Sequence, residues 1–87
     1  MDGTRQQLKM ESEKWLQRIK ERIKTMKILK PSKELDTVIE NLNAYIKDCD
    51  FFLEKKDFVR AFEAVVYAWG ILETCEHLSL LTTSQKT

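Results

Sequence analysis

The segment covering residues 57–81 constrains the fold most strongly, because it reads as one helix with an unusually large apolar surface. Twelve of the fifteen residues from 58 to 72 are apolar. A helix that is hydrophobic nearly all round must be covered on several sides. The sequence therefore predicts a helix over residues 58–81 that lies at the centre of a bundle or buries one flank against another protein. A narrow polar line is left to face water, consisting of Arg60, Glu63, Tyr67, Gly70, Thr74 and His77.

Apolar residues that recur at steps of three and four predict two further helices. The first covers residues 4–29 and is ended by Pro31, because the residue before a proline is displaced from the α region. The second covers residues 32–54, with Ser32 or Pro31 at its start. Asp57 is well placed to cap the third helix. Residues 1–3 and 82–87 show no periodicity, and we expect them to fray.

Size and composition favour a single helical domain spanning residues 1–87. A chain of 87 residues is too short to bury two separate cores. It contains only two glycines and one proline, so it is poor in the turn residues that sheets require. Three helices of about 24 residues would each be roughly 36 Å long. Three such helices joined by short turns indicate an all-α fold, an antiparallel up-down-up three-helix bundle.

Charge is nearly balanced over the whole chain but not along it. The net charge is +1, whereas residues 1–31 carry nine basic and four acidic side chains and residues 32–87 carry six and ten. The first helix is therefore the basic element. No secretory signal pattern is present, and Arg60 and Glu63 interrupt the longest apolar segment. We therefore expect a cytoplasmic protein with no membrane partner.

The two cysteines are expected to be free thiols. If the second and third helices form a hairpin about a turn near residue 56, Cys49 lies opposite about residue 63. Cys75 is then roughly 18 Å further along the helix. Because the Cα atoms of a disulfide approach within about 7 Å, Cys49 and Cys75 are predicted to be small buried hydrophobic residues.

Three segments in the second half of the chain carry a family resemblance. They are residues 45–57 (YIKDCDFFLEKKD), 58–64 (FVRAFEA) and 67–73 (YAWGILE). This region, residues 43–81, resembles a family of short archaeal proteins called domain of unknown function 357. The resemblance implies a small three-helix bundle of archaeal origin. It supplies no catalytic residues.

The sequence offers little for catalysis or for metal binding. It has no phosphate-binding glycine loop and only one histidine, so no usable nucleophile and base pairing is apparent. Glu73 and His77 share one helical face, but zinc normally takes three or four ligands. They are more simply an ordinary surface pair. We therefore expect a protein that is not an enzyme and that holds no cofactor or metal.

The favoured function is a protein-protein interaction or homo-oligomerising module, for which the third helix supplies the contact. A three-helix bundle leaves part of each helix exposed, and an exposed apolar patch of a few hundred Å² usually marks a binding site. The candidate interface residues are Val59, Val66, Tyr67 and Trp69. The partner is then either a second copy of the chain or another protein.

The predicted hairpin also brings together a polar cluster of Tyr45, Asp48, Glu63 and Tyr67. Neighbouring carboxylates that share a proton have shifted pKa values, so the cluster is a candidate ligand or proton-transfer site. Tyrosine hydrogen bonding at the edge of a core is the simpler interpretation, and we favour it.

Nucleic-acid binding, to RNA in particular, is the alternative function. Residues 18–33 carry seven basic side chains and one acidic one. Arg18, Arg22 and Lys27 are the candidate phosphate contacts. No exposed aromatic residue or glycine-rich loop interleaves with them for base stacking, so a solvated basic face is the favoured interpretation.

Overall fold

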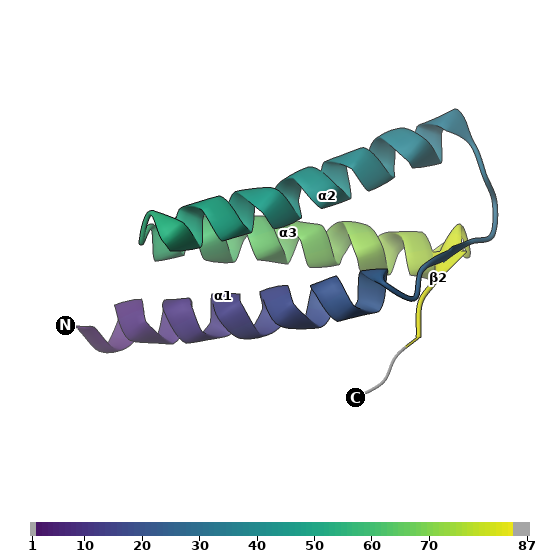
Figure 1. Cartoon of the computed structure of the whole chain (residues 1–87). Helices are drawn as coiled ribbons and strands as arrows, with labels where there is room; N and C mark the ends of the chain where they lie inside the picture. The colour runs from purple at the N-terminus through teal and green to yellow at the C-terminus, as the bar shows by residue number, and fades with distance from the viewer. Residues whose placement is uncertain (1, 85–87) are drawn as a thin grey trace.

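The computed structural model describes residues 2–84, which form three helices and one short pair of strands (Figure 1). The helices are α1 (Asp2–Ile23), α2 (Lys33–Glu54) and α3 (Phe58–His77). The strands are β1 (Lys27–Ile28), which lies between α1 and α2, and β2 (Leu81–Thr82), which follows α3. The prediction of an all-α, up-down-up three-helix bundle is confirmed. No helix within residues 2–84 is both long and apolar enough to cross a membrane.

The hairpin of α2 and α3 is defined by local backbone signals at its ends. The Ser32 hydroxyl caps α2 by accepting a hydrogen bond from the Leu35 N–H at 3.0 Å, and the Asp57 carboxylate caps α3 by accepting from the Arg60 N–H at 3.2 Å. Between the helices, Lys56 has a φ of 62°. The Lys56 N–H donates to the carbonyl of residue 53 at 3.0 Å, and the Asp57 N–H donates to that of residue 52 at 2.9 Å. These paired bonds form a Schellman motif, which turns the chain directly into α3.

Lys56→Gly is expected to raise the free energy of unfolding by about 1 kcal/mol, because a side chain in the left-handed region costs roughly that amount. Urea denaturation followed by circular dichroism measures the change. Lys55→Gly is the matched control, since Lys55 lies one position earlier with a right-handed φ of −81° and should be destabilised by glycine. Equal effects of the two substitutions would contradict this account of the turn.

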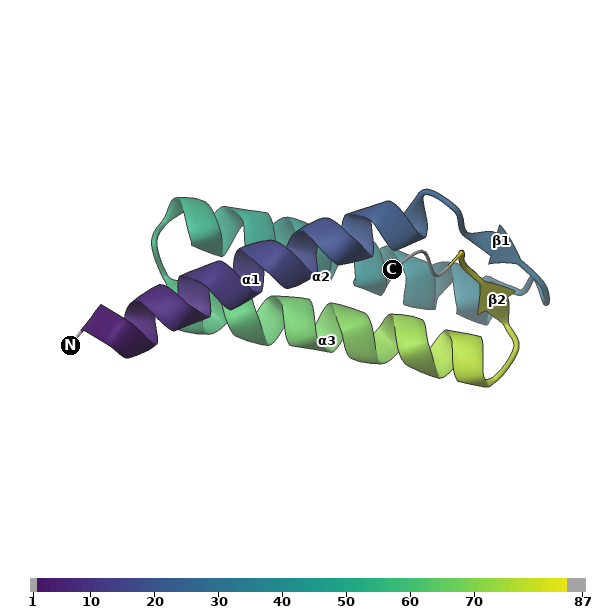
Figure 2. The ribbon, with the colours of Figure 1, turned by 90° about the horizontal axis from the view of Figure 1, so that it is seen from below.

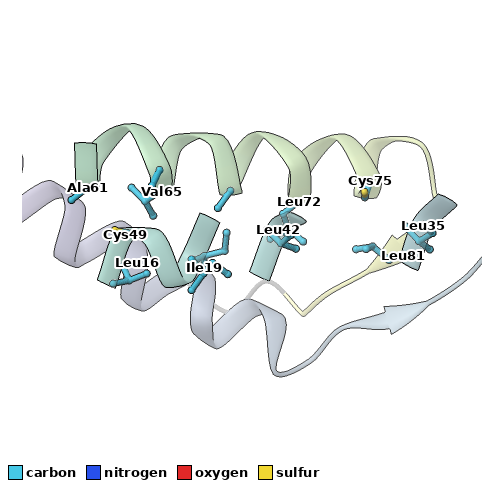
Figure 3. Packing of buried hydrophobic residues seen from close by; sticks show 13 residues of the cluster. Leu16, Ile19, Leu35, Leu42, Cys49, Ala61, Val65, Leu72, Cys75 and Leu81 are labelled. Carbon is cyan, nitrogen blue, oxygen red and sulfur yellow. The ribbon is translucent and has the colours of Figure 1, made fainter. Parts of the chain in front are cut away.

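The core lies where α3 packs against both other helices, most extensively against α2 (Figure 3). Small residues Ala61, Ala64 and Ala68 of α3 are buried and let the neighbouring helices approach closely. Ile19 of α1, Leu42 of α2 and Leu72 of α3 are almost fully buried and fill the space between them. Small and large side chains thus interdigitate in the manner of a well-packed bundle.

The exposed side of α3 is broader than the narrow polar line predicted from the sequence. All six residues of that line are exposed, and Val59, Val66 and Glu73 are exposed beside them. Two neighbouring helices cover only part of the circumference of a third. Part of the apolar surface of α3 therefore stays uncovered, as its composition indicated.

The prediction that the first helix continues to residue 29 is wrong, since α1 ends at Ile23. The Thr25 hydroxyl donates to the backbone carbonyl of Arg22 at 2.8 Å and accepts from the Ser84 N–H at 2.7 Å. Beyond this turn, Ile28 of β1 pairs with Leu81 of β2. Side-chain capping and strand pairing together outweigh the helical propensity of the segment, and Pro31 lies well past the helix end.

The prediction that the third helix continues to residue 81 is also wrong. It ends at His77, followed by Ser79 with a φ of 60°. The Leu80 N–H donates to the carbonyl of Cys75 at 3.0 Å, and the chain then turns into β2. Residues 2–3, expected to fray, belong to α1, and residues 82–84 are held by the strand pair and by hydrogen bonds. Residues 1 and 85–87 lie outside the described range.

The strand pair lies at the end of the bundle where α2 and α3 diverge (Figures 1 and 2). Its antiparallel register places Lys27 opposite Thr82. The N–H groups of Leu29 and Lys30 donate to the carbonyl of Leu80 at 2.9 and 3.0 Å. Leu81 is 1% exposed and lies near Leu35 in the same core cluster (Figure 3). The strands therefore complete the core at the end of the bundle that the helices leave open.

Candidate interaction surface

The outer face of α3 carries three exposed apolar side chains. Val59 is 58% exposed, Val66 is 50% exposed and Tyr67 is 61% exposed. Gly70, in the next turn, is also exposed. Three of the four candidate interface residues are therefore largely exposed.

Two shallow grooves run along the sides of this face. The groove between α1 and α3 has a volume of about 350 Å³ and is lined by Trp15, Phe62, Val65, Val66, Trp69, Gly70 and Glu73. The groove between α2 and α3 has a volume of about 580 Å³ and is lined by Val38, Val66, Tyr67, Gly70, Ile71, Thr74, Cys75, Leu78 and Leu80. Because Val66 and Gly70 line both, the grooves form one continuous and largely apolar surface across α3.

Unlike Val59, Val66 and Tyr67, Trp69 does not lie on the outer face of α3. Its indole N–H donates to the backbone carbonyl of Trp15 at 3.0 Å, and the two indole rings meet edge to face with centroids 5.7 Å apart. The Trp69 ring is thereby fixed as a wall of the first groove. It contributes a rigid apolar surface rather than a side chain that is free to move.

The predicted polar cluster is only partly assembled. The rings of Tyr45 and Tyr67 stack with centroids 5.4 Å apart. Asp48 and Glu63 are both exposed, and within residues 2–84 neither forms an ion pair. The structure therefore shows an aromatic contact between α2 and α3 in place of a carboxylate pair.

The candidate nucleic-acid contacts have different environments. The Arg22 Nη2 donates to both carboxylate oxygens of Glu76, at 2.7 and 2.8 Å, and each side chain is only 17% exposed. Arg18 lies over the Trp15 ring, 4.8 Å from its centroid. Lys27 is exposed in β1. The three side chains do not form one free basic patch, because Arg22 is neutralised.

Sequence reasoning missed the polar cluster around Arg22. The Arg22 Nε donates to the Thr83 hydroxyl at 3.0 Å, and that hydroxyl donates in turn to Glu76. The guanidinium also lies over the ring of Trp69, 5.1 Å from its centroid. This cluster joins the ends of α1 and α3 to the residue after β2. No local pattern could have indicated it, since Arg22 is 54 positions from Glu76.

Both cysteines are buried free thiols, in agreement with the sequence analysis. Burial, with a smaller contribution from Asp50, raises the pKa of the Cys49 thiol to about 11. Burial and the neighbouring Glu76 raise the pKa of Cys75. A thiol that stays protonated is a poor nucleophile and a poor metal ligand.

The pair of Glu73 and His77 lies on the exposed face of α3. Within the described part of the chain, residues 2–84, no three metal-ligating side chains come together. Neither residue is placed to build a larger coordination site with residues of α1 or α2.

Comparison with known proteins identifies a family and a solved structure of the same fold. A family model described as protein of unknown function (DUF357) matches residues 14–81. The crystal structure of protein AF1782 from Archaeoglobus fulgidus, which carries the same family model, is 39% identical in sequence. The two structures superpose with a TM-score of 0.82, and the match covers 94% of this chain and 100% of that one. None of the curated proteins matches the chain. The family model and the archaeal relative confirm the resemblance seen in the sequence, and the chain belongs to the DUF357 family.

Proposed function

We propose that this chain is a non-enzymatic protein-interaction module that binds through the outer face of α3. One observation carries the proposal: two apolar grooves meet at Val66 and Gly70. Isolated exposed apolar residues are normal, but a contiguous apolar surface is typical of an interaction site. Rigid aromatic walls next to exposed aliphatic residues are also typical of protein contacts.

The chemistry of the surface favours binding over catalysis. The two grooves are lined chiefly by apolar atoms. The cysteine thiols are buried. The nucleic-acid alternative gains no comparable support, because Arg22, one of its three candidate contacts, is already paired with Glu76. A phosphate would have to displace a partly buried carboxylate to reach it.

Site-specific photo-crosslinking tests the proposal. A benzophenone amino acid in place of Val66 should give a discrete adduct with a protein in native cells. The same probe at Lys47, an exposed position of α2 outside both grooves, should give none. The protein in the adduct, identified by mass spectrometry and purified, should bind the purified chain. Val66→Lys should weaken that binding about tenfold or more, as expected for a central contact residue.

The control for the binding measurement is Lys47→Glu, which should leave the affinity unchanged. Equal adducts at residues 66 and 47, or no adduct at residue 66, would count against the proposal. So would an adduct whose protein does not bind the purified chain.

A further inference from the structure

The fold of the single chain does not explain why residue 70 is a glycine. Gly70 lies inside α3 with an ordinary helical backbone, and a Cβ added there would meet nothing within 4 Å beyond its chain neighbours and the nearby backbone of its own helix. Neither a turn nor internal packing explains the glycine. Glycine weakens a helix interior relative to alanine. What glycine does provide is a bare stretch of backbone that a second helix can approach closely.

The exposed residues of α3 are spaced like the seam of a helix pair. Val59, Glu63, Val66, Gly70, Glu73 and His77 alternate at steps of four and three, and all six are exposed. Residues at this spacing share one face of a helix, so a second helix packed along that face would contact them. Gly70 lies near the middle of that seam, at the meeting point of the two grooves.

We infer that the partner at this surface is a second copy of the chain, whose α3 packs antiparallel across Gly70. The inference rests on the proposed function and names its partner. With a twofold axis at Gly70, each residue faces the one equally distant on the other side. Glu63 then faces the partner's His77, and Val66 faces the partner's Thr74. Each contact occurs twice, so an acidic group meets an imidazole at both ends of the seam.

Charge disfavours two other ways of pairing two copies of α3. In a parallel pair, Glu63 and Glu73 would each lie opposite the same residue of the partner. In an antiparallel pair centred between Val66 and Gly70, Glu63 would lie opposite the partner's Glu73. Both arrangements place like charges face to face, which opposes association. Only the crossing at Gly70 matches Glu63 with the partner's His77.

Sedimentation velocity on the purified chain tests the inference, over concentrations from about 1 μM to 1 mM, a range that covers weak and moderate association. We expect a reversible monomer-dimer equilibrium. Gly70→Ala should weaken the dimer about tenfold, because a methyl group then separates the crossing helices. The same substitution should raise the Tm of the monomer by roughly 3–6 °C, since alanine is the better helix former. Opposite effects on association and on stability distinguish a contact residue from a structural one.

A charge exchange tests the orientation. Glu63→Lys and His77→Glu should each weaken the dimer about tenfold, and the double variant should recover most of the loss because a lysine then faces a glutamate at each end of the seam. Glu40→Lys, the same charge change at an exposed position of α2, is the matched control and should leave the dimer unchanged.

A chain that remains monomeric up to about 1 mM would overturn the inference, as would a dimer that is indifferent to Gly70→Ala or to the charge exchange. These outcomes leave the proposed function to be decided by the crosslinking experiment. There, an adduct with a different protein supports an interaction module that does not pair with itself.

Discussion

Leu81→Ala is expected to lower the free energy of unfolding by about 3 kcal/mol and the Tm by roughly 15 °C. Leu81 is 1% exposed and belongs to the main core cluster, although it comes from a strand of only two residues. The helices diverge around it, so its removal leaves a void that they cannot readily close. Thermal unfolding followed by circular dichroism at 222 nm measures the change.

Leu78→Ala is the matched control for this substitution. Leu78 lies three residues earlier at the same end of the molecule and is 55% exposed. Its truncation should cost less than about 1 kcal/mol. If the two variants unfolded at the same temperature, Leu81 would not be a core residue, and β2 would be only a surface attachment.

Glu76→Gln is expected to cost about 2 kcal/mol, the second largest effect among these predictions. It removes the charge that faces Arg22 at 2.7 Å in a site where both side chains are only 17% exposed. A charge left unpaired in such a site is costly, whereas neutralising both partners is tolerated. The double variant with Arg22→Met should therefore be destabilised by at least about 1 kcal/mol less than the sum of the two single variants.

The control pair is Lys20 and Asp50, which joins α1 to α2 at 2.9 Å but is 41% and 51% exposed. Asp50→Asn should change the free energy of unfolding by less than about 1 kcal/mol, because solvent screens such a pair. Equal costs for Glu76→Gln and Asp50→Asn in urea denaturation would show that burial does not strengthen the interaction of Arg22 with Glu76.

The helical core was predictable because its signals are local. The apolar spacing of α2 gave bounds within one residue of the observed helix, and Asp57 caps α3 as predicted. The ends of α1 and α3 were not predictable in the same way. Thr25 stops α1 partly through a hydrogen bond from Ser84, and Leu81 leaves the helical pattern to pair with Ile28. These contacts join distant parts of the chain, so no local window of sequence contains them.

The candidate surface was predictable to a similar degree. Val59 and Val66 were named as candidates because a three-helix bundle leaves part of each helix exposed, and both are exposed in the structure. Trp69 was different, because the backbone of Trp15 holds its indole. Arg22 was different as well, because Glu76 neutralises it. The sequence shows which side chains are apolar or basic. Which atom each of them hydrogen-bonds to depends on tertiary packing.

The strand pair joins distant parts of the chain, and this affects when it is expected to form during folding. The α2–α3 hairpin closes through contacts between neighbours in the chain, and such contacts form rapidly. Pairing Ile28 with Leu81 instead brings together residues more than fifty positions apart, and the entropy lost in closing that loop is recovered only once the helices already hold its ends near each other. We therefore expect the strand pair to form after the helices have packed and to open before they separate.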